Sequence, residues 1–496
     1  MRHILAIDEG TTGVTSLVIA ENGRVVGRGY REIPQYYPKP GWVEHDLVEI
    51  LDATVACARA AIAAAAVTPD AVGITNQRET VAVWDRETGR PLRRAIVWQD
   101  RRTAARCQAL RDGGHAARIA ELTGLVIDPY FSATKLQLML SDEGLLDRHG
   151  SGKLAVGTID SWLVWQLTRD HVHATEPTNA SRTMLYDIGA LKWSAELCTL
   201  FGVPMQMLPE VRPSSGDFGV TDRELLGVEI PIAGVAGDQQ AALFGQGCWE
   251  AGEGKNTYGT GAFLLLNAGS RRPSVDNVRE GILTTVGCDG AGRPAYALEG
   301  SIFIAGAAVQ WLRDGLGVIV DAAESEALAR QLESNDGVYF VPALVGLGAP
   351  DWEPNARGTI VGITRGTGRA HLARAALEAM AYSTADILGR MSAVSGVPFA
   401  RLRVDGGAAQ NDWLMQFQAD VLGVPVERPD MVETTALGAA GLAGIATGVW
   451  KDAKDFLARR EFDVHSPRME RQEADLLLAG WRRAVRAALS WARDAE

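Results

Sequence analysis

The sequence predicts an α/β protein of two domains, and three observations lead to that prediction. The chain has 496 residues, more than one hydrophobic core usually serves. Apolar strand-like runs and helical segments alternate up to about residue 247. A Gly/Thr turn that leads into an apolar strand occurs near the start and again after residue 256. We therefore expect domains over residues 1–247 and 248–496, each offering one such turn to a shared cleft.

The first half opens with a predicted β-hairpin. Residues 3–8 form an apolar run that ends in Asp8, and a second run covers residues 14–20. Glu21-Asn22-Gly23 is a turn sequence, and a third strand is expected over residues 24–30. An Ala-rich stretch at residues 47–66 carries apolar residues at helical spacing and predicts a helix.

The second half begins with a similar pattern, a Gly/Thr turn followed by an apolar strand. The Gly-rich segment 245–254 is expected to connect the halves, and the Gly/Thr turn 257–263 leads into an apolar strand at 264–266. The final segment, roughly 466–496, is a charged helical stretch that we interpret as a solvated face rather than a site.

Composition and net charge argue against some classes of binding partner. Apolar residues make up 47% of the chain and charged residues 22%, as in ordinary globular proteins. The formal net charge of −12 argues against general binding of nucleic acid or anionic membrane, because both need clustered Lys and Arg. A small phosphate ligand is still possible, since backbone amides and a metal ion can hold phosphate.

Cysteine usage and hydropathy predict a cytoplasmic protein. The cysteines lie far apart without a CxxC pair, which indicates free thiols in a reducing compartment. Asp8 interrupts the first apolar run too early for a signal peptide. No apolar stretch reaches the roughly 18–20 residues that a membrane span needs.

Several common cofactor motifs are missing from the sequence. Lys153 and Lys255 each follow a glycine, but neither segment fits GxxxxGK[ST]. No GxGxxG follows a strand and no HExxH occurs. Dinucleotide-binding and metalloprotease functions are therefore disfavoured.

The turn from Asp8 to Gly13 is the first candidate for chemistry. A strand that delivers a carboxylate beside Gly and Thr suits phosphate, because Gly admits backbone amides and Asp can hold hydrated Mg²⁺. An ordinary polar hairpin turn explains the same residues equally well.

Arg78 and Glu79 follow an apolar run at residues 71–74, where a strand ends. Side by side they present donors and acceptors, which suits the hydroxyls of a small polyol. Taken alone, a surface ion pair of little energetic value is the more common explanation.

Asp238 stands at an apparent loop-to-helix junction in the segment 236–245. It could act as a general base for an attacking hydroxyl. A helix N-cap is the alternative, and spacing alone slightly favours the cap.

The segment 404–411 is a strand followed by a Gly turn and Asn411. Backbone amides there can border an adenosine, and Asn411 can bond a base edge. A plain left-handed turn after a strand is about as common an explanation.

Longer motifs in a fixed order decide between these alternatives. From near residue 3 to about 490 the chain resembles the FGGY family of carbohydrate kinases. The matching segments are residues 37–46, 73–80, 96–99, 124–131, 178–184, 237–245, 256–261, 310–314, 346–350 and 358–378.

The resemblance implies a fold and an activity. The fold is two ribonuclease-H-like domains of the actin and hexokinase type around a central cleft. The motifs are most similar to family members that act on glycerol, which implies ATP-dependent phosphorylation of glycerol to sn-glycerol 3-phosphate, with Mg²⁺, in glycerol catabolism. A homodimer or homotetramer is expected. A kinase of a larger polyol or ketose such as xylulose is the nearest alternative, and a non-catalytic ATP-driven switch is a more distant one.

The resemblance also implies roles for individual residues. Asp238 matches the catalytic base, and Asp8 with Asp238 is expected near Mg²⁺. The residues expected to contact glycerol are Arg78, Glu79, Trp98, Tyr130, Asp238, Gln239 and Phe263, with Trp98 and Phe263 as apolar walls. The residues expected to bind the nucleotide are Thr11, Thr12, Gly13, Thr260, Gly306, Gln310, Gly407 and Asn411.

Three positions depart from the family pattern. Glu9 stands where Gln is usual, and Thr15 replaces a frequent Arg that reaches the nucleotide phosphates, so we expect weaker nucleotide binding. Glu229 falls where some bacterial members carry an Arg used for inhibition by fructose 1,6-bisphosphate. A carboxylate there would repel phosphate, so we do not expect this regulation.

Overall fold

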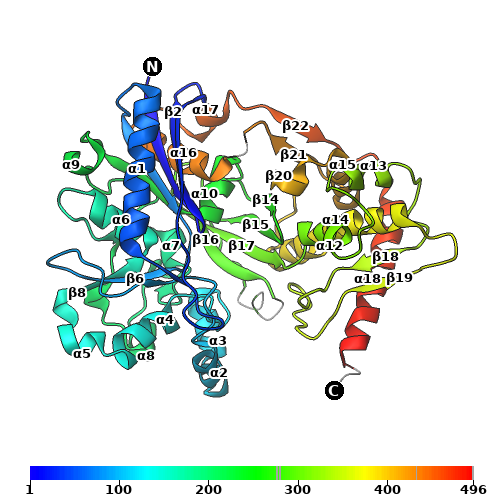
Figure 1. Cartoon of the computed structure of the whole chain (residues 1–496), viewed down its shortest axis with the longest axis horizontal. Coiled ribbons are helices and arrows are strands. Elements are labelled where there is room, and N and C mark those ends of the chain that lie inside the picture. Colours follow the sequence, from blue (N-terminus) through cyan, green and yellow to red (C-terminus); the bar gives the residue numbers. More distant parts are fainter. Residues whose placement is uncertain (275–277, 279–280, 432, 494–496) are drawn as a thin grey trace.

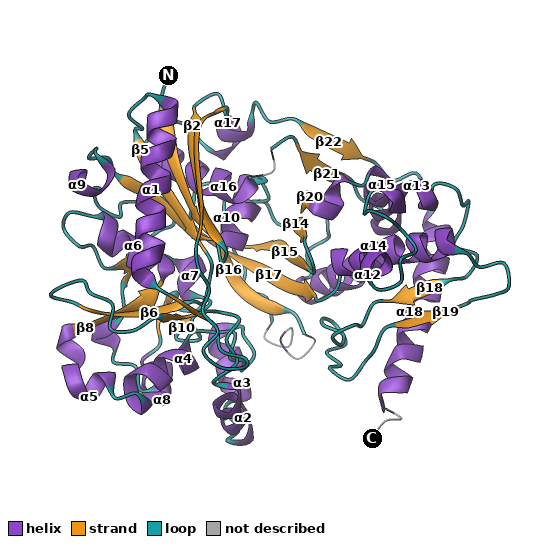
Figure 2. Cartoon of the chain, in the orientation of Figure 1, coloured by secondary structure: helices purple, strands orange, loops and turns teal. Residues whose placement is uncertain are grey.

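The computed structural model describes residues 1–274, 278, 281–431 and 433–493. One large mixed sheet lies in each half of the molecule, and helices cover the sheets (Figures 1 and 2). A smaller four-stranded sheet, in the order β4-β7-β6-β8, belongs to the first half.

The helices and strands of the first half end at Gly245. They are β1 (His3–Glu9), β2 (Gly13–Ala20), β3 (Val25–Glu32), β4 (Glu44–His45), α1 (Leu47–Ala65), β5 (Ala71–Asn76), β6 (Val81–Asp85), β7 (Ala95–Ile96), α2 (Ala104–Asp112), α3 (Ala116–Thr123), α4 (Ala133–Gln137), α5 (Leu145–His149), β8 (Leu154–Thr158), α6 (Ile159–Leu167), β9 (Ala174–Thr175), α7 (Pro177–Ala180), β10 (Tyr186–Asp187), β11 (Lys192–Trp193), α8 (Ala195–Phe201), β12 (Glu210–Val211), α9 (Arg223–Leu226), β13 (Ile232–Gly237) and α10 (Asp238–Gly245).

Those of the second half begin at Glu253. They are β14 (Glu253–Tyr258), β15 (Ala262–Gly269), β16 (Leu283–Cys288), β17 (Pro294–Ile302), α12 (Gly306–Asp314), α13 (Glu324–Ala329), β18 (Tyr339–Val341), β19 (Thr359–Val361), α14 (Arg369–Ser395), β20 (Arg401–Gly406), α15 (Asp412–Leu422), β21 (Val426–Pro429), α16 (Thr434–Ala446), α17 (Ala453–Leu457), β22 (Phe462–His465) and α18 (Arg471–Arg493).

The first large sheet has the strand order β13-β5-β1-β2-β3. β1 is antiparallel to β2 and parallel to β5, with Asp8 opposite Thr75. β13 is parallel to β5, with Gly237 opposite Asn76. The carboxyl ends of β1, β5 and β13 therefore meet at one edge of the sheet, where ligands of open α/β sheets usually bind.

Both faces of this sheet are buried, and alternate residues of β1 face opposite layers. Leu5 and Ile7 belong to the apolar cluster that includes α1, whereas Ile4 and Ala6 belong to the cluster that includes α16. The second layer therefore comes from the other half of the chain.

Close backbone contact fixes α16 in this position. A Cβ on Gly73 of β5 would lie 2.2 Å from the carbonyl oxygen of Ala439, and one on Gly438 would lie 1.8 Å from that of Ala241 in α10. Both distances are far below van der Waals contact, so only glycine permits α16 to approach the sheet and α10 this closely.

The second large sheet repeats the arrangement of the first. Its order is β16-β17-β15-β14-β20-β21-β22, with β14 antiparallel to β15 and parallel to β20, and β20 parallel to β21. β14 thus corresponds to β1, and Thr257 opposite Asp405 corresponds to Asp8 opposite Thr75. The predicted internal parallel between the halves is present in the topology.

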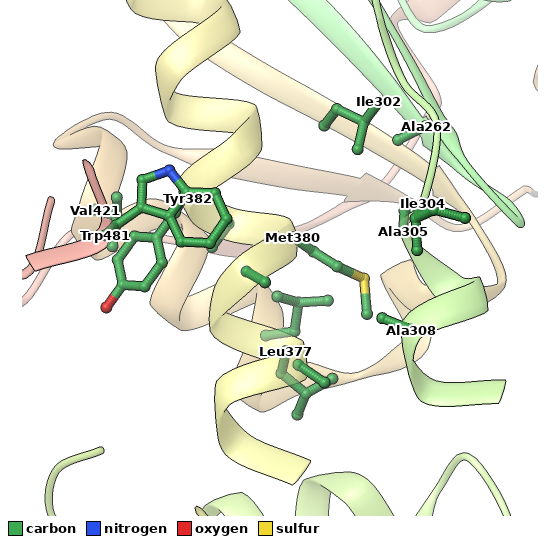
Figure 3. Packing of buried hydrophobic residues seen from close by; sticks show 14 of the residues in the cluster. Ala262, Ile302, Ile304, Ala305, Ala308, Leu377, Met380, Tyr382, Val421 and Trp481 are labelled. Carbon is green, nitrogen blue, oxygen red and sulfur yellow. The ribbon is translucent and has the colours of Figure 1, made fainter. Parts of the chain in front are cut away.

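The core of the second half is built around α14 (Figure 3). Met380 points toward Ala308 of α12, and Tyr382 stacks on Trp481 of α18 with ring centroids 5.5 Å apart. Each fully buried large side chain contributes about 1.5–3 kcal/mol relative to an exposed one.

The expected elements are largely present. The predicted hairpin corresponds to β1, β2 and β3, the helix at 47–66 to α1, and the strand at 264–266 to part of β15. The solvated face expected at 466–496 needs a correction, because α18 buries one side, including Leu478 and Trp481. The domain division at residue 247 stays a prediction. Among the described residues, no helix has the length and apolar character to cross a membrane.

Candidate active site

The carboxyl ends of three strands bring the first group of predicted residues together. Asp8 is the last residue but one of β1, Arg78 and Glu79 follow β5, and Asp238 begins α10 directly after β13. Because β1, β5 and β13 are neighbours, residues that are far apart in the sequence lie close together in the structure.

A small cavity of about 60 Å³ lies at this edge. Its lining consists of Thr11, Arg78, Glu79, Trp98, Tyr130, Asp238, Gln239 and Phe263. All seven residues expected to contact the polyol therefore line one cavity, together with Thr11, which was expected to bind nucleotide.

Asp238 is held at the mouth of the cavity. Its Oδ1 lies 3.1 Å from Nε of Arg78 and accepts a hydrogen bond from the Gln239 N–H at 2.6 Å. Gly237 is the N-cap of α10, so the N-cap interpretation of Asp238 is wrong. The Asp238 side chain is 31% exposed and that of Arg78 is 2% exposed, so the carboxylate remains open to a ligand.

Aromatic rings form the apolar wall. Trp98 and Tyr130 meet edge to face with ring centroids 5.5 Å apart. Nε1 of Trp98 donates a hydrogen bond to Oγ1 of Thr11 at 2.9 Å. This bond joins the wall of the small cavity to the turn at the end of β1.

Two buried residues that the sequence analysis did not single out brace the cavity. Arg182 donates to Glu79 at 2.6 Å and to Glu299 at 2.9 Å, and Arg78 donates to Glu299 at 2.6 Å. Glu79 has a φ of 63°, a conformation that costs energy for a residue with a Cβ. Its bond to Arg182 helps to hold it there.

Both bracing residues carried a weak sequence signal. Arg182 lies inside the motif 178–184, and Glu299 is the one charged residue of strand β17. A lone charge in such a strand indicates a buried ion pair but does not identify its partner.

A larger cavity of about 550 Å³ lies in the second half. It is lined by the turn between β14 and β15, by α12 and α14, and by the turn after β20. Of the residues expected to bind nucleotide, this cavity contains Thr260, Gly306, Gln310, Gly407 and Asn411. Thr12 and Gly13 line neither cavity and lie in the turn beside Thr11.

Backbone turns shape this second cavity. The N–H of Gly306 donates to the carbonyl of Gly259 at 3.0 Å, and that of Ala305 to the carbonyl of Thr260 at 2.8 Å. Gly406, the last residue of β20, has φ 88° and ψ 176°, a backbone conformation open to glycine but outside the left-handed helical region, and a short 3-10 turn over Gly407–Gln410 follows it. The plain left-handed turn considered for this segment is therefore wrong. Asn411 caps α15 by accepting a hydrogen bond from the Leu414 N–H at 2.9 Å, which leaves its amide NH₂ group for a ligand.

Asp8 and Asp238 form a site suited to a hard cation. Burial, with the nearby Asp238 carboxylate, raises the pKa of Asp8 to about 7. Among the described residues, no donor contacts the Asp8 carboxylate. The two carboxylates repel each other, and a bound cation would offset that repulsion; oxygen ligands are those that Mg²⁺ prefers.

Lys255 of β14 is a further buried cation beside the small cavity. Its Nζ donates to Oε1 of Gln239 and, at 2.8 Å, to Oγ1 of Thr257. Burial lowers its pKa, although Asp405 and Asp238 oppose that shift.

Comparison with known proteins covers nearly the whole chain. Residues 3–245 match the N-terminal domain of the FGGY family of carbohydrate kinases, and residues 254–447 match its C-terminal domain. The glycerol kinase of Halorhodospira halophila is 53% identical over 100% of this chain and 98% of that protein. Glycerol kinase 2 of Thermotoga maritima is 52% identical over 99% of both chains.

Solved structures agree with this assignment. The crystal structure of Plasmodium falciparum glycerol kinase with ADP superposes with a TM-score of 0.93 at 35% identity, covering 99% of this chain and 98% of that one. The gluconate kinase of Lactobacillus acidophilus, 21% identical, shares the fold with a TM-score of 0.87 over 99% of this chain and 98% of that one. The expected fold, two domains of the actin and hexokinase type, is confirmed. The chain belongs to the FGGY family of carbohydrate kinases.

Proposed function

We propose that this protein transfers the γ-phosphoryl group of ATP to a terminal hydroxyl of glycerol and forms sn-glycerol 3-phosphate, as a step of glycerol catabolism. One observation carries the proposal: Asp238, Arg78 and Glu79 meet in a small cavity whose walls are aromatic rings. Relatives about 50% identical over the full chain are named glycerol kinases.

The chemistry of the small cavity suits a triol. Each hydroxyl of glycerol both donates and accepts, and the cavity offers donors on Arg78 and acceptors on Glu79 and Asp238. Trp98 and Tyr130 leave little room for the five carbons of a ketose. Glycerol is therefore favoured over xylulose or gluconate.

The larger cavity is the proposed binding site for ATP. Its turns offer backbone amides for phosphate oxygens, and Leu377 and Met380 of α14 give it an apolar side for a base. A relative of this fold holds ADP. We assign Thr260, Gly306, Gln310, Gly407 and Asn411 to this site, and the turn Thr11–Gly13 to the phosphates.

Asp238 is the proposed general base. Phosphoryl transfer through a loose transition state asks the protein mainly for alignment and charge compensation. The Asp238 carboxylate accepts the proton of the attacking hydroxyl while Arg78 and Glu79 orient the alcohol. Enclosure between the halves of the chain excludes water, the competing nucleophile.

Asp8 and Asp238 are the proposed Mg²⁺ residues. Bound there with ATP, the ion would neutralise charge on the phosphates. A cytoplasmic location and assembly into a dimer or tetramer are part of the proposal and follow from the family resemblance.

A coupled assay of ADP release tests the substrate. Glycerol, xylulose and gluconate are supplied at equal concentration with ATP and Mg²⁺. We expect release with glycerol to exceed the other two by about 100-fold or more in kcat/KM, because the cavity's polar groups match only the triol. Equal or faster release with xylulose would reassign the substrate. No release with any of the three, together with no heat on calorimetric titration of glycerol, would favour a non-catalytic ATP-driven switch.

A further inference from the structure

Five charged side chains form one cluster beside the small cavity. Arg78 and Arg182 are the cations, and Glu79, Glu299 and Asp238 are the anions. The arginines and glutamates are at most 2% exposed, and only Asp238 reaches the solvent. Charges buried this deeply must be paired, so the position of each depends on the others.

Glu299 differs from the rest of the cluster in its origin. It lies on β17 of the second sheet, whereas the other four residues belong to the first half of the chain. It does not line the cavity. Its contact with the proposed chemistry is therefore indirect and passes through Arg78.

The shortest contacts of Arg78 with carboxylates are those with Glu299 and Asp238. Glu79 lies farther from Nε, at 3.9 Å, and Nη1 also donates to Oε1 of Gln240 at 3.2 Å. Nη1 and Nη2 donate to the two oxygens of Glu299 at 2.6 and 3.3 Å, in the forked geometry that arginine prefers with carboxylates. Only Nε faces Asp238, at 3.1 Å. Glu299 thus occupies the edge of Arg78 that could otherwise form a forked pair with Asp238.

Arg182 holds Glu299 in this position from the other side. Its Nη2 donates to Oε1 of Glu299 at 2.9 Å, and its Nε donates to Glu79. The Arg182 guanidinium also lies 5.5 Å from the centre of the Tyr130 ring. Burial alone would raise the pKa of Glu299, but Arg182 and Arg78 hold it at about 2, so Glu299 is a permanent anion.

We propose that Glu299 is a positioning residue for the phosphoryl transfer: it takes the forked edge of Arg78 and so leaves Asp238 free to accept the substrate proton. This inference rests on the proposed function. Without the Glu299 charge, Arg78 would turn toward the nearest remaining anion at the cavity, the Asp238 carboxylate. Asp238 would then form a forked ion pair with Arg78 and would be a poorer acceptor for the proton of the substrate hydroxyl.

The substitution Glu299→Gln tests this proposal, because it keeps the shape of the side chain and removes only the charge. We expect kcat to fall about 10-fold or more, because the base is engaged, while the KM for ATP stays within about 2-fold. The number of folded sites is counted by calorimetric titration with ADP, so kcat refers to competent molecules. A purely structural role would lower the melting temperature and the number of sites but leave kcat per site unchanged.

Glu299→Asp is the conservative variant. It keeps the charge on a shorter side chain, so we expect kcat between those of the wild type and Glu299→Gln. A Gln variant with wild-type kcat per site, or an Asp variant as slow as the Gln variant, would overturn the proposal. If the Gln variant does not fold, the Asp variant decides alone: a lowered kcat with unchanged ATP KM supports positioning, and wild-type kcat overturns it.

Glu378→Gln is a matched control. Glu378 is also a buried glutamate paired with an arginine, Arg374, at 2.7 Å, but it lies on α14 and lines neither cavity. We expect a lower melting temperature with unchanged kcat and KM. The two proposals can fail separately. If the wild-type protein does not phosphorylate glycerol, the proposed function is refuted. If the wild type is active and Glu299→Gln keeps the same kcat, only the role of Glu299 is refuted.

Discussion

The two cavities proposed to bind glycerol and nucleotide are built in different ways. The smaller one, about 60 Å³, is lined by charged and aromatic side chains that a buried ion-pair cluster holds in place. The larger one, about 550 Å³, is lined by Gly-rich turns, by the apolar side of α14 and by polar side chains of α12 and α13, such as Gln310 and Arg313 of α12. The shape and chemistry of the smaller cavity depend mainly on which side chains line it, whereas those of the larger cavity depend more on the course of the backbone. Substitutions should therefore act differently at the two sites.

The largest expected effect is at the base of the smaller cavity. Asp238→Asn removes the proton acceptor but keeps an amide oxygen for a hydrogen bond. We expect kcat to fall by roughly 10²-fold or more, with glycerol binding retained. Coupled ADP release gives kcat, and calorimetric titration gives the Kd for glycerol. Near-normal turnover would remove Asp238 from the role of base.

The next effect is a pH dependence of the protein's free energy of unfolding that arises from Lys135, a buried residue near the smaller cavity. Lys135 is buried beneath it, and its Nζ donates to the Tyr130 carbonyl at 2.8 Å. Burial lowers its pKa to about 7, although Glu79 and other carboxylates oppose the shift. The unfolded chain keeps this proton up to its ordinary pKa near 10.5, so the unfolded state binds more protons between pH 7 and 10.

The free energy of unfolding should therefore fall by about 2 kcal/mol between pH 9 and pH 7 because of Lys135, and this term should level off below the folded-state pKa. Lys135→Met should remove this part of the slope. Urea unfolding at pH 7, 8 and 9 measures it in both proteins. Identical slopes would mean that Lys135 does not titrate as described.

A pair of glycines tests the larger cavity. A Cβ on Gly407 would have no neighbour within 4 Å, whereas one on Gly306 would lie 2.6 Å from the carbonyl oxygen of Gly259. Gly407→Ala should therefore leave the melting temperature unchanged and raise the KM for ATP about 3- to 10-fold, because the methyl group enters the nucleotide space.

Gly306→Ala is the companion variant. It should lower the melting temperature as well as ATP affinity, since the turn backbone has to move. In both variants the KM for glycerol should stay at its wild-type value. A change in glycerol KM equal to that for ATP would show that the cavities do not act separately.

The smallest effect concerns the hydrogen bond between Trp98 and Thr11, which joins the aromatic wall of the smaller cavity to the turn proposed to bind the phosphates. Trp98→Phe keeps the aromatic wall but removes the hydrogen bond to Thr11. We expect the KM values for glycerol and ATP to rise by at most about 2- to 10-fold each, because a neutral hydrogen bond contributes about 0.5–1.5 kcal/mol. Thr11→Val should have the same effect, and the double variant should add nothing further. If the effects of the two substitutions on KM were fully additive, the hydrogen bond between Trp98 and Thr11 would not couple the two residues.

The residues that could be predicted from the sequence are those with a local signal. Arg78 and Asp238 each follow a short apolar run, so their place at a strand end is visible without the fold. The resemblance then placed both in one site. Alternation of strands and helices likewise predicted the α/β class of the first half.

The residues that escaped prediction depend on distant pairing. Glu299 contacts Arg182 from a position 117 residues later, and no local pattern specifies that pairing. Thr11 was expected at the nucleotide, but it also bonds Trp98 because β1 and the segment after β7 meet in space. Burial of α18 against α14 was missed because α18 is amphipathic: its charged residues face solvent, and they do not reveal that the opposite, apolar face is buried.

The position of α16 has a consequence for how the chain folds during synthesis. β1, β5 and β13 leave the ribosome long before residues 434–446 are made, so the apolar face of the first sheet that includes Ile4 and Ala6 lacks the cover of α16 at that time. Exposed apolar sheet in a nascent chain is a target for chaperones and for aggregation. The early half completes its own core only when nearly all of the late half has been translated.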